Sequence, residues 1–131
     1  MDSESAPTVT TPVSEPLPEP APTLVIGQDE PTFAWVVILN GPRRGRLYPL
    51  RLEGTSLGRV PPNDIELDDD AVSRFHARFV GERVGDRVTF FVQDLASANG
   101  TFVNGQRIVR ERLQDEDRIT VGNTTLVFKQ L

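Results

Sequence analysis

The chain has 131 residues, of which 37% are hydrophobic, and its formal net charge is −5. This length allows one domain of ordinary size with an additional segment, and hardly two domains. The sequence has no cysteine, which excludes disulfides and thiolate metal sites. It shows neither the pattern of a signal peptide nor a run of about 20 apolar residues, so we expect a cytoplasmic protein that does not bind a membrane.

The negative charge is concentrated at the beginning of the chain. Residues 1–30 contain six acidic residues and no lysine or arginine, which leaves 13 acidic against 14 basic residues in 31–131. A nucleic-acid-binding domain usually concentrates positive charge on one face. The nearly neutral remainder therefore argues against nucleic acid as a partner, although a local anion site needs only a few charges.

Residues 1–32 are rich in proline, threonine and glutamate and contain no aromatic side chain. Six prolines fall between Pro7 and Pro22, and proline at that density prevents both helix and sheet hydrogen bonding. The segment also has too few apolar groups to offset the entropy cost of ordering it. We therefore predict a disordered tail over residues 1–32 and a single folded domain over residues 33–131.

From Phe33 onward, short β-branched and apolar runs alternate with turn residues. Asn104-Gly105 is the strongest turn signal, because both residues accept the positive φ of a two-residue hairpin. No window has a helical period with caps. The spacing predicts an all-β antiparallel sandwich or barrel, with strands at 35–39, 45–50, 55–59, 77–80, 87–92, 102–103, 106–109, 118–121 and 124–129.

Three predicted loops carry polar residues that packing does not require. Loops at the end of a sandwich are where binding residues tend to gather. The motifs in these loops resemble, in order and spacing, those of the forkhead-associated (FHA) domain, over approximately residues 34–131. The matching segments are Gly58-Arg59, Ser73-Arg74-Phe75-His76, Ser97-Ala98-Asn99-Gly100-Thr101 and Asn104-Gly105.

The resemblance implies an FHA-type antiparallel β-sandwich whose loops at one end bind phosphothreonine peptides. Arg59 and Ser73 then look like the principal phosphate contacts, and Asn99 looks like the residue that holds the peptide main chain. Arg74 occupies a position where the family often adds a further contact. Three more residues look like structural support for the site, namely Gly58, His76 and Gly100.

The chemistry of these residues agrees with that role. The Arg59 guanidinium is a planar fork suited to phosphate oxygens, the Ser73 hydroxyl adds a neutral donor, and the Asn99 amide can both donate and accept. Ala98 departs from many FHA domains, in which a serine or threonine at this position adds one more hydroxyl. The resemblance also implies that the residues before Ser73 help to select the third residue after the phosphothreonine. Because residues 71–72 are alanine and valine, we predict an aliphatic or aromatic residue there.

Simpler interpretations of the same residues are also open. Arg59 could pair with Asp64, with Glu66 or with one of the aspartates at 68–70, and Ser73 could merely cap a turn. The aspartate run lacks the alternating carboxylates, central glycine and terminal glutamate of a calcium loop. We expect it to be a solvated acidic turn, and we predict no metal.

Catalysis has little support in the sequence. Ser73, His76 and Asp94 could be imagined as a triad, but the chain has no Gly-x-Ser-x-Gly elbow and no strand–turn–helix to present one. It also has no Walker loop, kinase signature or metal-ligand cluster. We therefore expect a binding module without enzymatic activity or a cofactor.

The resemblance and the chemistry together predict a phosphothreonine-binding adaptor in Ser/Thr-kinase signalling. Its expected partners are threonine-phosphorylated proteins, such as a kinase or the substrates of that kinase. Thr8, Thr10 and Thr11 are predicted phosphoacceptors in the tail, and a phosphorylated tail could occupy the domain's own site. The alternative is a phosphate-independent scaffold that uses a sheet face or a loop to hold a protein partner.

Overall fold

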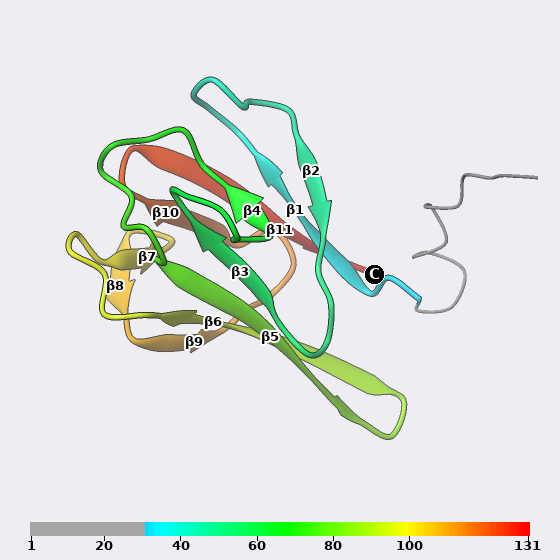
Figure 1. Ribbon diagram of the computed structural model, residues 1–131. Helices are drawn as coiled ribbons and strands as arrows, with labels where there is room; N and C mark the ends of the chain where they lie inside the picture. Colours follow the sequence, from blue (N-terminus) through cyan, green and yellow to red (C-terminus); the bar gives the residue numbers. More distant parts are fainter. Residues whose placement is uncertain (1–30) are drawn as a thin grey trace, which may run out of the picture. The chain divides into compact units, whose positions relative to one another are not determined.

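The computed structural model describes residues 31–131, which form eleven strands and no helix (Figure 1). This confirms the all-β prediction. The predicted disorder of residues 1–32, with Thr8, Thr10 and Thr11, falls outside the described residues except for its last two positions. Within residues 31–131 there is also no helix that could cross a membrane.

The strands are β1 Ala34–Ile38, β2 Leu47–Pro49, β3 Thr55–Gly58, β4 Ile65–Glu66, β5 Ala77–Val84, β6 Arg87–Asp94, β7 Thr101–Val103, β8 Gln106–Ile108, β9 Arg110–Arg112, β10 Arg118–Val121 and β11 Thr124–Gln130.

The strands form two sheets, as expected for the predicted sandwich. One sheet has the order β2-β1-β11-β10-β7-β8, and the other has the order β4-β3-β5-β6-β9. Neighbouring strands are antiparallel, except that β3 and β4 run parallel with Leu57 beside Ile65. Alternate residues are buried along β1 and β11, which is typical of strands with one face on the core.

Two strands lie outside the sequence prediction. β4 has only two residues, and β9 consists of Arg-Glu-Arg, so neither has the alternating apolar pattern that marks a strand. β9 lies at the edge of its sheet, where it pairs with β6 while its three side chains stay exposed. Charged side chains on an edge strand are a common protection against pairing with other chains.

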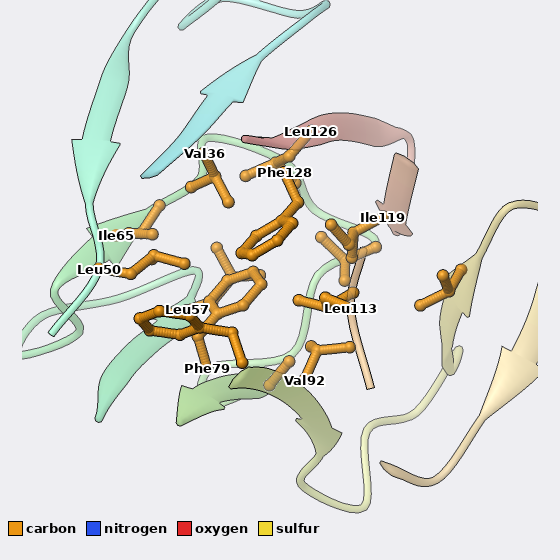
Figure 2. Packing of buried hydrophobic residues seen from close by; sticks show 14 of the residues in the cluster. Val36, Leu50, Leu57, Ile65, Phe79, Val92, Leu113, Ile119, Leu126 and Phe128 are labelled. Carbon is orange, nitrogen blue, oxygen red and sulfur yellow. The ribbon is translucent and has the colours of Figure 1, made fainter. Parts of the chain in front are cut away.

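The core lies between the two sheets and is built from aliphatic and phenylalanine side chains (Figure 2). The ring centroids of Phe90 on β6 and Phe128 on β11 lie 5.9 Å apart with an interplanar angle of 55°, so this contact joins one sheet to the other. Full burial of a side chain of this kind contributes about 1.5–3 kcal/mol. The buried residues labelled in Figure 2 are Val36, Leu50, Leu57, Ile65, Phe79, Val92, Leu113, Ile119, Leu126 and Phe128.

Three loops meet at one end of the five-stranded sheet. Leu57 near the end of β3 pairs with Ala77 at the start of β5, and Ala77 pairs with Asp94 at the end of β6. The sandwich therefore brings the loops that carry the sequence motifs to a common edge. These loops are the β3–β4 loop (59–64), the β4–β5 loop (67–76) and the β6–β7 loop (95–100).

The two ends of the described domain lie side by side. Ala34 at the start of β1 is opposite Gln130 at the end of β11. Beyond this pair, the Leu131 N–H donates a hydrogen bond to the Phe33 carbonyl oxygen at 3.1 Å. The first and last strands thus close the domain against each other.

Candidate functional site

Gly58 ends β3 at the point where two loops come into contact. A Cβ at this position would overlap the carbonyl oxygen of Arg74 and the side-chain amide of Asn63. Because the obstructing atoms include main chain, no larger residue fits. Directly after Gly58, the Arg59 N–H donates to the carbonyl oxygens of Ser73 and Arg74, at 3.1 and 3.2 Å. The glycine thus lets the loop that carries Arg59 bind the loop that carries Ser73.

The Arg59 side chain is exposed and is oriented by one main-chain contact. Its Nε–H donates to the Val72 carbonyl oxygen at 2.9 Å. Within the described part of the chain Arg59 forms no ion pair, and its candidate partner Asp64 binds the N–H and the hydroxyl of Ser56 at 2.9 and 3.2 Å instead. Asp64 also lies 3.7 Å from the Arg51 guanidinium. The interpretation of Arg59 as half of a surface ion pair therefore finds no support among these residues, and its terminal nitrogens can meet an anion.

His76 is fully buried and links two loops through both of its ring nitrogens. Nδ1 accepts from the Ser73 N–H at 3.0 Å, and Nε2 lies 2.8 Å from the Gly100 carbonyl oxygen. Because a carbonyl oxygen can only accept, Nε2 carries the proton and the ring is neutral. Both nitrogens are thus bound to main chain, so the imagined relay from the Ser73 hydroxyl through His76 to Asp94 is not assembled.

Two further hydrogen bonds join the β4–β5 loop to the β6–β7 loop. The Ser73 hydroxyl oxygen accepts from the Ala98 N–H at 3.0 Å, and the Asn99 Nδ2 donates to the Ala71 carbonyl oxygen at 2.8 Å. The Ser73 hydroxyl keeps its own proton for donation to a ligand, and the Asn99 amide keeps its oxygen as an acceptor. Ala98 has no hydroxyl to offer, and its contribution is the main-chain N–H that positions Ser73.

Asp94 organises the β6–β7 loop. Its carboxylate accepts from the Ser97 N–H at 3.1 Å, from the Ser97 hydroxyl at 2.5 Å and from the buried Thr101 hydroxyl at 2.8 Å. Burial raises the pKa of Asp94, but these hydrogen bonds favour the ionised form more strongly and bring the pKa below its ordinary value of 3.8. Gly100 completes the loop with a φ of +88°, a left-handed conformation that residues with a Cβ rarely adopt.

The acidic run at 68–70 has a structural residue at its centre. The Asp69 carboxylate accepts from the Ala71 N–H at 2.9 Å, the Asn123 N–H at 2.8 Å and the Thr124 hydroxyl at 2.7 Å. It therefore fastens the β4–β5 loop to the turn before β11. Burial raises the pKa of Asp69, but the hydrogen bonds outweigh burial and lower it. No group of three metal-ligating side chains occurs among the described residues.

The two residues before Ser73 match their expected role in peptide selection only in part. Val72 is 1% exposed and cannot touch a bound peptide, whereas Ala71 is half-buried. The part of the prediction that relied on Val72 is therefore wrong, because this side chain belongs to the core. The preference for an aliphatic or aromatic third residue depends on Ala71 alone and stays a prediction.

Asn63 belongs to the site although the sequence pattern does not single it out. It is 7% exposed, and its Nδ2 donates to the carbonyl oxygens of Val60 and Arg74 at 2.7 and 2.6 Å. Its Oδ1 is buried and has no hydrogen-bond partner among residues 31–131. This one side chain closes the β3–β4 loop and holds it against the β4–β5 loop. An asparagine in a proline-rich turn looks ordinary in the sequence, and only the three-dimensional contact reveals its role.

The structure thus brings the predicted contact residues together from three loops, of which the β4–β5 and β6–β7 loops lie on the left of Figure 1. The exposed residues among them are Arg59, Arg74 and Asn99, and Ser73 is half-buried. The predicted support residues, Gly58, His76 and Gly100, are buried beneath. This arrangement places a cation, a hydroxyl and an amide around one small surface, where they could bind an anionic group and the chain that carries it.

Replacement of Asn63 by alanine should loosen the loop that carries Arg59. The change leaves the carbonyl oxygens of Val60 and Arg74 without this donor, for an expected loss of about 1–3 kcal/mol in the free energy of unfolding. Chemical denaturation measures the loss. The control Gln106→Ala, at an exposed position on β8, should change stability by less than about 0.5 kcal/mol. An Asn63→Ala protein as stable as the parent would contradict the assigned role.

Asp94→Ala should destabilise the domain by about 1–3 kcal/mol near neutral pH, because the Ser97 and Thr101 donors lose their acceptor. The folded-state pKa of Asp94 is lowered, so the native carboxylate stabilises the fold above its ordinary pKa of 3.8 and ceases to do so as the pH falls through the folded value. The stability difference between the parent and the variant should therefore shrink below about pH 4. Urea denaturation over that range checks this, and a constant difference would refute it.

Comparison with known proteins places the chain in a family. The model of the FHA domain matches residues 55–122. The oxoglutarate dehydrogenase inhibitor of Corynebacterium jeikeium is 42% identical over 95 residues, which cover 72% of this chain and 63% of the relative. The glycogen accumulation regulator GarA of Mycobacterium tuberculosis is 40% identical over 98 residues, which cover 75% of this chain and 58% of the relative.

The fold agrees with that placement. A solved FHA domain, studied for its phosphothreonine-dependent interactions, matches with a TM-score of 0.67 and 29% sequence identity over 76% of this chain and 98% of its own. The chain spans less than two thirds of the length of the two curated relatives. Sequence motifs, sandwich topology and both comparisons agree, and the chain belongs to the FHA domain family.

Proposed function

We propose that this domain binds threonine-phosphorylated peptides and acts as an adaptor in Ser/Thr-kinase signalling. The observation that carries the proposal is the meeting of three polar groups from three loops: the Arg59 guanidinium and the Ser73 hydroxyl as donors, and the Asn99 amide with its oxygen as an acceptor. A phosphate dianion on a protein surface requires charge-assisted donors in fixed positions. The contacts of Gly58 and His76 fix these donors before a ligand arrives.

The strength expected of such a site suits a reversible signalling contact. Each charge-assisted hydrogen bond contributes about 1.5–3 kcal/mol net. Two or three of them, with a main-chain contact from Asn99, bring a phosphopeptide to roughly micromolar affinity, since about −8.2 kcal/mol corresponds to about 1 μM. The exposed guanidinium of Arg74 is available to add a further contact.

The relatives support a binding role. The solved FHA domain takes part in phosphothreonine-dependent interactions, and the two relatives are named as an inhibitor and a regulator. We accordingly assign this chain a regulatory role without catalysis, in the cytoplasm, where it would meet Ser/Thr kinases. Its proposed partners are a threonine-phosphorylated kinase or the phosphorylated substrates of that kinase.

Matched peptides that carry phosphothreonine, phosphoserine or unmodified threonine test the proposal by isothermal titration calorimetry. We expect only the phosphothreonine peptide to bind, and we expect Arg59→Ala to weaken binding by at least about 2 kcal/mol, because charge-assisted bonds are lost. Arg112→Ala is the control, because it removes an equal charge from β9. Arg112 lines a pocket together with Arg87, at the end of β6 opposite the site loops, so this variant should bind like the parent. Equal affinity for all three peptides would instead favour a phosphate-independent scaffold.

Phosphorylation of Thr8, Thr10 or Thr11 should switch the domain off, because a phosphothreonine on the same chain competes for the site. Attachment to the same chain gives such a competitor an effective concentration of about 1 mM. The test compares phosphorylated and unphosphorylated full-length protein for binding of a phosphothreonine peptide, and we expect the former to bind at least about tenfold more weakly. The variant with all three threonines changed to alanine, treated with the same kinase, is the control. Unchanged binding after phosphorylation would end the proposed switch.

A further inference from the structure

Arg107 on β8 lies against the glycine that completes the β6–β7 loop. A Cβ on Gly100 would lie 2.8 Å from Nε, 3.0 Å from Cζ and 3.2 Å from Nη2 of Arg107. The three guanidinium atoms are nearly equidistant from that point, so the planar group packs across the α-carbon of Gly100. Because Gly100 has no side chain, it can adopt the left-handed conformation of the turn and also leave room for the Arg107 guanidinium.

The donors of Arg107 remain available at this position. The side chain is exposed, and within residues 31–131 it makes no hydrogen bond and no ion pair. Arg110, three residues further along, shows the contrast: its guanidinium binds Glu82 at 3.3 Å and lies 4.0 Å from the centre of the Phe91 ring. Arg107 is therefore a positioned cation with no counter-ion from the described domain.

The location of Arg107 connects it to the proposed phosphopeptide site. Asn99, the proposed main-chain clamp, directly precedes Gly100, and the Gly100 carbonyl oxygen is held by His76 at 2.8 Å. In the proposed function, a peptide with its phosphothreonine at Arg59 and its main chain at Asn99 lies beside the loop against which Arg107 packs. Arg107 is thus a further exposed cation beside the loop that carries Asn99.

We infer that Arg107 forms a second anion subsite, which takes the carboxylate side chain of an aspartate or glutamate near the phosphothreonine. This inference rests on the proposed function and names the ligand class more closely: a phosphothreonine peptide with an acidic residue in its flank. A guanidinium fork matches a carboxylate in a bidentate geometry. Since the fork already packs on Gly100, less side-chain entropy is lost when the carboxylate binds.

The test uses short alanine-based peptides with one central phosphothreonine and a single glutamate placed in turn at each flanking position. With the parent protein, glutamate at one position or two adjacent positions should tighten binding about threefold to fivefold over the all-alanine peptide, as for a partly exposed ion pair. In Arg107→Gln this gain should vanish, while the all-alanine phosphopeptide binds as before. Lysine at the same position should weaken binding to the parent and strengthen binding to Arg107→Glu.

Controls separate this subsite from general electrostatics. Arg112→Gln and Arg112→Glu change the net charge equally on β9, away from the site, and should keep the glutamate preference intact. Arg107→Lys keeps the charge without the fork and should retain only part of the gain. Thermal denaturation of each variant checks that the exposed substitution leaves the fold intact.

The outcomes of these titrations separate the acidic subsite at Arg107 from the proposed phosphothreonine binding. If the all-alanine phosphopeptide binds but no glutamate position improves affinity, or if the preference survives in Arg107→Gln, the acidic subsite is refuted and the phosphothreonine site stands. If no phosphopeptide binds the parent protein, the proposed function fails and the subsite fails with it.

Discussion

The arrangement of the loops depends on the buried imidazole of His76. It accepts from the main chain of one loop and donates to the main chain of another, at Ser73 and Gly100. Because the ring uses only main-chain partners, the Ser73 hydroxyl remains free of this structural duty. Loss of such a buried bridge would leave an N–H and a carbonyl oxygen unpaired, at about 1–3 kcal/mol each. The geometry of the exposed site is therefore fixed from beneath.

A division between supporting and exposed groups follows from that bridge. The groups that hold the loops are buried or bound within the domain: Asn63 beneath the β3–β4 loop and Asp94 within the β6–β7 loop. The guanidinium groups of Arg59, Arg74 and Arg107 are exposed. Donors held in place before binding lose little entropy when an anion arrives. In the proposed function, this is how a nearly neutral domain presents a local site for a negatively charged group.

Much of the fold is readable from the sequence because its signals are local. The Asn104-Gly105 turn signal predicts the hairpin there, and the φ of Asn104 is +50°. The spacing of the motifs predicts the site loops. β9 is missed because its sequence, Arg-Glu-Arg, has no apolar residue that would mark it as a strand. Val72 is misjudged and Asn63 overlooked for one reason: whether a loop side chain points into the protein depends on contacts between segments distant in sequence. The packing of the Arg107 guanidinium against Gly100 likewise depends on a contact between different strands and loops, which the local sequence does not show.

The adjacency of Phe33 and Leu131 has a consequence for how this domain can be combined with others. Asn123, bonded to Asp69 of a site loop, directly precedes β11, whereas Leu131 follows the opposite end of that strand. A domain that enters and leaves at neighbouring points, remote from its binding loops, can be inserted into a surface turn of a host protein. Circular permutation, with new ends at the exposed β5–β6 hairpin tip near Gly85, should likewise preserve the binding surface.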